Sequence, residues 1–233
     1  MNLKAVLFDF NGVIINDEPI HQQLIDEILI RENLRPDDAD YKQYCLGKSD
    51  RAGLRSLLAS RGRILSEDYL TKLIENKTKA YREKIESLEN LPIYPNLLEF
   101  LSKLQERGIL IGLVTGALRS EAEFILQRGE IAQYFNVIVG GEEVDRSKPE
   151  PDGYLLAVEI LNQQNPNLNL QPQECLAIED TPAGIEAAKK AQMQVVGIAN
   201  TYPLHMLQRQ ANWTVDNLLE IELDRVNKLL SEK

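Results

Sequence analysis

The sequence predicts an α/β fold, a doubly wound parallel sheet with a Rossmann-like core and an inserted α-helical cap domain. Three observations lead to this fold class. Short apolar runs alternate with helix-like stretches, polar residues follow most of these runs directly, and one long interval after the first run contains helix-like stretches only. Strands and helices that alternate along a chain favour right-handed crossovers and a parallel sheet.

Five continuous apolar runs predict the strands of this sheet. The first run, KAVLF, stops at Asp9 and is followed by the turn-like pair Asn11-Gly12. A run that is apolar on both faces is typical of a strand buried inside a parallel sheet. The five runs cover residues 4–8, 109–114, 135–139, 175–178 and 194–198.

Helical periodicity fills most of the intervals between these runs. Ligands of doubly wound folds bind at the carboxyl ends of the strands. Asp9, Thr115 and the pair Glu179-Asp180 stand at such ends, which makes them candidates for a site. The predicted helices of the core cover residues 96–107, 118–128, 152–162 and 183–191.

The interval from about residue 17 to residue 91 breaks the alternation. It holds amphipathic segments at 18–32, 51–61 and 67–87, and Pro92 and Pro95 mark the return to the core. We therefore expect a core domain made of residues 1–16 and 92–233, and a helical cap domain made of residues 17–91. Movement of the cap would need hinges near residues 15–18 and 91–95.

Composition excludes several classes of partner. The 233 residues carry a formal charge of -10 with a pI near 4.9, which argues against binding to nucleic acid or to an anionic membrane. Cys45 and Cys175 have neither zinc-site nor CxxC spacing, so both are expected to be small buried side chains of a reducing compartment. The chain shows no signal peptide and no apolar stretch of about 20 residues, and we expect a cytoplasmic monomer or weak dimer.

Four motifs resemble those of the haloacid dehalogenase-like hydrolases, in particular the branch of beta-phosphoglucomutase and related sugar-phosphate phosphatases. They appear in the order and spacing of that family and extend over nearly the whole chain. The motifs are FDFNGVIINDEPIH at residues 8–21, LVTGA at 113–117, SKPEPDGY at 147–154 and IEDTPAGIEAA at 178–188.

The resemblance implies a phosphoryl-transfer site. A carboxylate at a strand end, here Asp9, attacks phosphorus and forms an aspartyl-phosphate. Lys148 offsets negative charge on the nucleophile and on the phosphoryl group, and the hydroxyl of Thr115 binds a phosphoryl oxygen with help from the backbone amides of Gly116 and Ala117. Without the other motifs, each side chain has a plain alternative as a helix cap, turn or loop residue.

The same resemblance implies a bound Mg²⁺ ion. Its oxygen ligands would be the carboxylates of Asp9 and Asp180 and the backbone carbonyl of Asn11, while Glu179 binds the metal or supports its ligands.

Asn11 departs from the family pattern, which usually has a second aspartate two residues after the nucleophile. That aspartate resembles a general acid toward the leaving oxygen and a base in the second step, whereas an amide moves no proton. We expect a slow enzyme, or a substrate with a good leaving group. Asn11 is either native, or introduced to trap a complex, or subject to deamidation. The sequence alone predicts that Asn11→Asp raises turnover of a generic phosphate ester by at least roughly an order of magnitude.

The predicted cap supplies candidate contacts to the rest of the substrate. His21 matches a cap histidine of the phosphoglucomutase branch that faces the active site. The segment LGKSDRAGL at 46–54 resembles the substrate-specificity loop of that branch, and it offers Lys48, Ser49 and Arg51. The plain alternatives are a packed histidine and a helix-capping serine with solvated basic neighbours.

These observations predict a magnesium-dependent phosphatase or phosphomutase that acts on a small phosphorylated metabolite such as a sugar phosphate. An alternative is a weakened member of the family that binds a phosphometabolite or has a regulatory role without turnover. Hydrolysis of a carbon–halogen bond is a third, less favoured reading, because it would not need Asp180.

Overall fold

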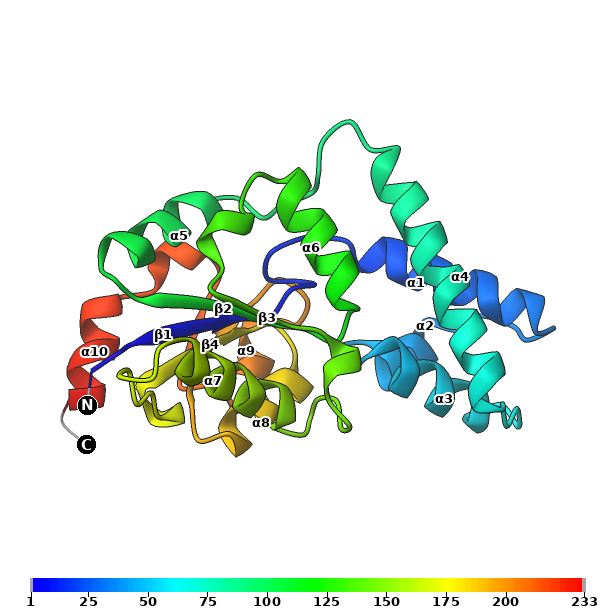
Figure 1. Ribbon diagram of the computed structural model, residues 1–233. Helices are drawn as coiled ribbons and strands as arrows, with labels where there is room; N and C mark the ends of the chain where they lie inside the picture. Colours follow the sequence, from blue (N-terminus) through cyan, green and yellow to red (C-terminus); the bar gives the residue numbers. More distant parts are fainter. Residues whose placement is uncertain (1, 232–233) are drawn as a thin grey trace.

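The computed structural model describes residues 2–231 and contains one sheet of six parallel strands (Figure 1). The strand order is β3-β2-β1-β4-β5-β6, so the chain starts in the middle of the sheet and extends it to both sides. This is the doubly wound topology that the sequence predicts. The strands are β1 (Ala5–Phe8), β2 (Leu110–Val114), β3 (Val137–Val139), β4 (Cys175–Glu179), β5 (Gln194–Ile198) and β6 (Trp213–Val215).

All five predicted strands are present, with ends that differ from the prediction by at most two residues. Strand β6 was not predicted. It has three residues at the edge of the sheet, and only Val215 is buried. A strand this short gives neither a continuous apolar run nor a clear alternation, so its sequence carries little signal.

Helices cover both faces of the sheet, because successive strand residues point to opposite sides. Val6 and Phe8 of β1 belong to one core cluster, and Ala5 and Leu7 belong to the other. The first cluster includes residues of α5 (Leu97–Glu106), α6 (Arg119–Arg128) and α10 (Leu223–Ser231). The second includes residues of α7 (Asp152–Gln164), α8 (Pro182–Lys190) and α9 (Leu204–Leu207).

Between β1 and α5, the described chain contains helices and isolated bridges but no strand of the sheet. These helices lie to one side of the sheet in Figure 1 and bury a cluster of their own, built around Leu54, Leu57 and Leu58. A short π-helical turn at Tyr41–Cys45 joins the second and third of them. The helices are α1 (Glu18–Arg31), α2 (Asp38–Asp40), α3 (Asp50–Ser60) and α4 (Glu67–Glu86).

Two connections join these helices to the sheet, and they run side by side. Ile15 and Ile93 form an antiparallel bridge, the amide of Asn16 donates to the carbonyl of Pro92 over 2.8 Å, and the amide of Tyr94 donates to the carbonyl of Ile14 over 3.0 Å. The two connections are therefore tied to each other by a bridge and backbone hydrogen bonds.

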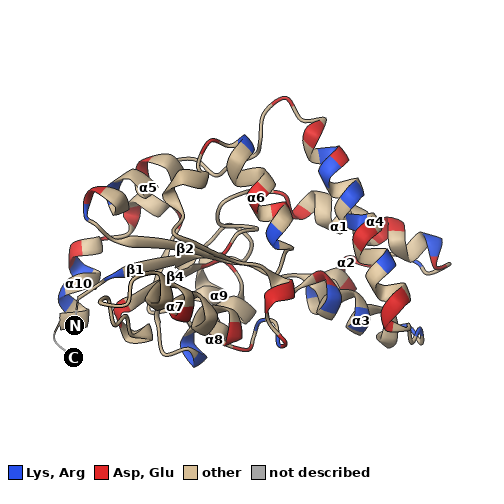
Figure 2. Cartoon of the chain, in the orientation of Figure 1, with Lys and Arg blue, Asp and Glu red and all other residues tan. Residues whose placement is uncertain are grey.

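Acidic and basic residues are interspersed along the helices, as the colours of α4 show in Figure 2. None of the helices in the described part of the chain combines the length and the apolar character that a membrane crossing requires.

Candidate active site

The carboxyl ends of three neighbouring strands bring the predicted catalytic side chains together. Phe8 of β1 is in register with Leu113 of β2 on one side and with Ile178 of β4 on the other. Asp9, just beyond Phe8, therefore lies between the end of β2, where Thr115 follows, and the end of β4, where Glu179 follows. The amide of Asp9 donates to the carbonyl of Ile178 over 2.9 Å, so the hydrogen bonding between β1 and β4 extends to Asp9 itself.

Lys148 links the ends of β1 and β4. Its ammonium lies 2.7 Å from Oδ1 of Asp9 and 2.7 Å from Oε1 of Glu179, and it donates to the carbonyl of Val114 over 3.1 Å. Burial alone would lower the pKa of Lys148, but the carboxylates of Asp9 and Glu179 raise it above its ordinary value. Lys148 is therefore a permanent positive charge inside the site.

The cluster of Asp9, Glu179 and Asp180 fits a divalent cation. One carboxylate oxygen from each residue lies within 4.8 Å of the others. Both oxygens of Asp180 and Oε2 of Glu179 are buried without a hydrogen bond of ordinary geometry, although the hydroxyl of Thr201 lies near Asp180. Burial, and then the charges of Asp9 and Glu179, raise the pKa of Asp180. Buried acidic oxygens without donors are ligands that a hard cation such as Mg²⁺ prefers.

Gly12 makes room for this cluster. Its φ of +79° is a conformation that side chains rarely adopt, and a Cβ at this position would lie 1.8 Å from Oδ2 of Asp180. Gly184 has the same role on the other side, since a Cβ there would lie 1.9 Å from Oε2 of Glu179. The backbone thus approaches closely at two places, one beside the Asp180 carboxylate and one beside the Glu179 carboxylate.

Thr115 is buried beside the cluster, and its hydroxyl oxygen accepts a hydrogen bond of 2.9 Å from the amide of Ala117. The hydroxyl hydrogen is thereby left to donate to a ligand. The amide of Ala117, which the sequence suggested as a donor to the substrate, instead holds Thr115 in place. Gly116 lies against the 48–49 loop, where an added Cβ would come within 2.9 Å of the backbone of Lys48 and Ser49.

A pocket opens beside Asp9 and is lined by residues from the sheet and from the helices of the inserted segment. His21, Lys48, Ser49, Gly116 and Ala117, all predicted to bind substrate, line it. So do Asn11, Glu18, Tyr41, Cys45, Asp50, Lys148 and Thr181.

Arg51 lies elsewhere. Its guanidinium bonds to Glu67 and Thr71 of α4, both at 2.9 Å, and it is not among the residues that line the pocket beside Asp9. Ser49 combines its position in the pocket wall with the plainer role, because its hydroxyl accepts from the amide of Ala52 and caps α3.

The two cysteines differ in their surroundings. Cys175 is buried in β4, as expected, whereas Cys45 is only partly buried and lines the pocket beside Asp9. Burial and the negative charge of Asp50 raise the pKa of Cys45 to about 12, so its thiol is protonated at neutral pH.

Asn11 is held by a buried carboxylate that sequence reasoning did not single out. Its side-chain nitrogen donates to both oxygens of Asp17, over 2.9 and 3.0 Å. Asp17 is completely buried and also accepts from the hydroxyl of Tyr81 over 2.5 Å, while Nε2 of His21 lies 3.3 Å away. Only the amide nitrogen can donate to a carboxylate, so these contacts fix which way the Asn11 side chain points.

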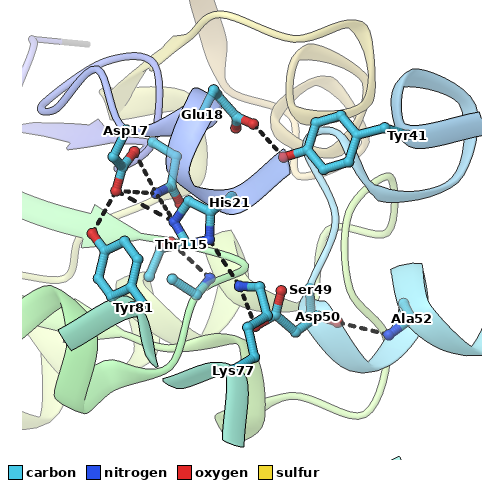
Figure 3. Close-up of polar contacts among 12 residues, drawn as sticks. Asp17, Glu18, His21, Tyr41, Ser49, Asp50, Ala52, Lys77, Tyr81 and Thr115 are labelled. Atoms are coloured by element: carbon cyan, nitrogen blue, oxygen red, sulfur yellow. Dashed lines mark hydrogen bonds and ion pairs between the residues drawn. The ribbon is translucent and has the colours of Figure 1, made fainter. Parts of the chain in front are cut away.

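The polar network continues into α4 and α3. The ammonium of Lys77 lies 2.8 Å from Nδ1 of His21 and 2.8 Å from Oδ2 of Asp50, as Figure 3 shows. An ammonium has hydrogens only to donate, so Nδ1 of His21 accepts and the ring hydrogen lies on Nε2, which is 3.3 Å from Oδ2 of Asp17 and 3.1 Å from the side-chain nitrogen of Asn11. The ring of His21 also stacks on Tyr81, with centroids 4.6 Å apart.

Lys77 and Tyr81 had a signal in the sequence. They lie four residues apart on the buried stripe of α4, which otherwise consists of Leu70, Leu73, Ile74 and Ile85. A lysine in the middle of an apolar helical stripe must have buried partners, because an unpaired buried charge is strongly unfavourable. Asp17 gave no such signal, since an acidic residue before a helix reads as an ordinary cap.

Comparisons with known proteins agree with this geometry. The chain matches the family described as haloacid dehalogenase-like hydrolase over residues 3–192. It is 30% identical over 221 residues to the beta-phosphoglucomutase of Bacillus subtilis, with 94% of this chain and 93% of that protein covered. It is 28% identical over 201 residues to a phosphorylated carbohydrates phosphatase of Thermotoga maritima, covering 85% of this chain and 87% of that one.

The fold is also shared with a solved structure. The crystal structure of beta-phosphoglucomutase from Clostridium difficile superposes with a TM-score of 0.85 at 24% identity, and the match covers 99% of this chain and 98% of that chain. The motifs, the converging strand ends and the family match together show that this chain belongs to the haloacid dehalogenase-like hydrolases.

Proposed function

We propose that this protein is a magnesium-dependent phosphatase or phosphomutase that acts on a small phosphorylated metabolite through an aspartyl-phosphate on Asp9. One observation carries the proposal above all others. The ammonium of Lys148 bridges Asp9 and Glu179 at 2.7 Å each, beside an Asp180 carboxylate whose oxygens are buried without a hydrogen bond of ordinary geometry. A fixed cation and a cluster of acidic oxygens that can bind a divalent ion, placed around one carboxylate, suit the transfer of a dianionic group.

The side chains of Asp9, Glu179 and Asp180 and the backbone carbonyl of Asn11 would hold the Mg²⁺ ion. When bound, it neutralises charge on the phosphoryl oxygens. Lys148 lies close enough to Asp9 to share this task, and its own charge is secured by the two carboxylates beside it.

The transfer proceeds in two displacements. In the first, a carboxylate oxygen of Asp9 forms a bond to phosphorus as the bond from phosphorus to the ester oxygen breaks, and the departing oxygen takes up a proton. Thr115 donates its hydroxyl hydrogen to a phosphoryl oxygen. In the second, the oxygen of water or of another hydroxyl attacks the phosphorus, loses its proton and releases Asp9. Water gives a phosphatase and a sugar hydroxyl gives a mutase.

Asn11 limits the proton transfers of both displacements, because an amide is neither a general acid nor a general base in this range of pH. We infer a preference for substrates whose leaving oxygen departs without help, such as acyl phosphates or activated esters. The corresponding cost on an ordinary sugar phosphate is about 10²–10⁴-fold in rate.

We propose that residues 17–91 form a cap that closes over Asp9 and selects the substrate, with the antiparallel connections at 15–18 and 91–95 as its hinges. His21, Lys48 and Ser49 line the pocket and would contact the part of the substrate that is not transferred. Acidic and basic side chains both line this pocket, which suits a small hydroxylated molecule. The relatives named for beta-phosphoglucomutase and for phosphorylated carbohydrates suggest a sugar phosphate.

A second function is favoured by Asn11 alone, namely a protein that binds a phosphometabolite without turning it over. One experiment distinguishes the two. Phosphate release from a panel of sugar phosphates, acyl phosphates and aryl phosphates is measured with and without Mg²⁺, for the parent and for Asp9→Asn. Magnesium-dependent release that Asp9→Asn abolishes supports the enzyme. Saturable binding of a panel member, without release by either protein, supports the binder and rejects the enzyme.

A further inference from the structure

The contact between Asn11 and Asp17 explains why position 11 holds an amide. Asp17 is fully buried, and both of its oxygens accept from the nitrogen of Asn11. The hydroxyl of Tyr81 donates to the same carboxylate over 2.5 Å, and Nε2 of His21 lies 3.3 Å from it. The side chains that contact the Asp17 carboxylate are therefore all groups that can donate a hydrogen.

A carboxylate at position 11 would face this anion directly. An aspartate has the same shape as asparagine, so one of its oxygens would replace the nitrogen that now lies 2.9 and 3.0 Å from the oxygens of Asp17. Two carboxylates at this distance repel each other, and neither has a hydrogen to offer. The single hydrogen on Nε2 of His21, which lies 3.1 Å from the present nitrogen of Asn11 and 3.3 Å from Oδ2 of Asp17, could serve only one of them at a time. Deamidation of Asn11 or a substitution by aspartate would place a negative charge where Asp17 already holds one.

We propose that Asp17 is a positioning residue that fits only a hydrogen-donating side chain at position 11, so that positions 11 and 17 can exchange amide and carboxylate only as a pair. The inference rests on the proposed function for its catalytic part. With an amide at position 17, the hydrogen bond between the two side chains would run from residue 17 to residue 11. A carboxyl at position 11 would then face a donor in place of a second carboxylate, and could serve the leaving oxygen. Asn11→Asp alone then gives much less than the order of magnitude in turnover that the sequence suggested.

The test is a double-mutant cycle of Asn11→Asp, Asp17→Asn and the exchanged pair, with Asn16→Asp as the matched control. Asn16 is exposed in the same loop, so its substitution adds the same charge without the contact. Thermal unfolding near neutral pH is measured for all five proteins, counting the parent. Stability needs no turnover, so this arm decides the pairing even when the proposed function is wrong.

We expect Asn11→Asp to lower the Tm by at least about 4 °C, Asp17→Asn to lower it as well, and the exchanged pair to unfold within about 2 °C of the parent. Asn16→Asp should leave the Tm unchanged. The pairing is overturned by an Asn11→Asp protein that is as stable as the parent, or by an exchanged pair whose loss in Tm is the sum of the two single losses.

A second arm separates positioning from a purely structural role. The kcat for an aryl phosphate, which has a good leaving group, is compared with the kcat for glucose 6-phosphate, which has a poor one. The ratio of kcat for glucose 6-phosphate to kcat for the aryl phosphate should be at least about 10-fold higher in the exchanged pair than in the parent, because an acid is now available to the leaving oxygen. An Asn11→Asp protein that shows the full gain by itself would overturn the positioning role. Absence of phosphate release from every variant would count against the proposed function, and the Tm cycle would still decide the pair.

Discussion

Gly12→Ala should abolish binding of a divalent cation at the cluster of Asp9, Glu179 and Asp180. Position 12 has a φ of +79°, and an ideal Cβ there lies 1.8 Å from Oδ2 and 2.6 Å from Cγ of Asp180. Ordinary contacts of a Cβ begin at 3.4 Å, so the carboxylate oxygen must retreat by about 1.6 Å. Metal sites tolerate deviations of only about 0.2 Å in ligand distance, so a retreat of this size removes Asp180 from the set of ligands.

Gly62→Ala is the matched control for the strain in the backbone. Gly62 has a φ of +76°, and a Cβ at that position would meet no atom within 4 Å. Both substitutions therefore carry the penalty of a left-handed alanine, about 1 kcal/mol, which lowers the Tm of a chain of this size by about 2–4 °C. Only Gly12→Ala adds the collision with Asp180.

The assay is thermal unfolding with increasing Mg²⁺. A ligand that binds only the native state stabilises it by RT ln(1 + [L]/Kd), so the Tm of the parent and of Gly62→Ala should both rise with Mg²⁺ concentration. Gly12→Ala should show none, and its turnover should fall with its loss of metal. The reasoning is refuted by a Gly12→Ala protein that keeps the Mg²⁺-dependent rise, or by a Gly62→Ala protein that loses it equally.

Three further predictions concern the pocket. Lys148→Met leaves buried carboxylates without their counter-charge, so it should lower the free energy of unfolding by about 3–5 kcal/mol and kcat by about 10²–10³-fold, as measured by denaturant titration and phosphate release. Lys48→Ala should raise KM, whereas Arg51→Ala should leave it unchanged because that guanidinium is engaged by α4; equal effects on KM would contradict this division. Alkylation of Cys45 by iodoacetamide, followed by mass spectrometry, should be slow at neutral pH, and its rate should rise steadily toward pH 12, because burial and Asp50 raise the pKa of Cys45 to about 12. A rate that stops rising near pH 9 would contradict this prediction.

The sequence was sufficient for the part of the molecule that local patterns determine. The buried central strands are apolar on both faces, and the polar residue after each one marks its carboxyl end, so Asp9, Thr115 and Glu179 could be assigned to one edge of the sheet. The long amphipathic helices of the inserted segment, α1, α3 and α4, were identified in the same way. β6 was missed because a three-residue edge strand, of which only Val215 is buried, carries too little pattern.

Contacts between distant residues were beyond the sequence. Asp17 and Tyr81 are 64 residues apart, and nothing in either local pattern indicates that they meet at Asn11. The direction of the Arg51 side chain depends on where α4 lies relative to α3, which local periodicity does not give. The predicted roles of the individual site residues therefore stay predictions, to be tested by the substitutions described above.

The central claim is that Asp9 carries the phosphoryl group, and trapping that group tests it most directly. The protein is mixed with an aryl phosphate and Mg²⁺, quenched in acid within one turnover, and digested for mass spectrometry of the peptide that contains residue 9. The account predicts a phosphoryl group on Asp9, which is absent from Asp9→Asn and from samples without Mg²⁺. Rapid release of phosphate with Asp9 unmodified, and unchanged in Asp9→Asn, would contradict it.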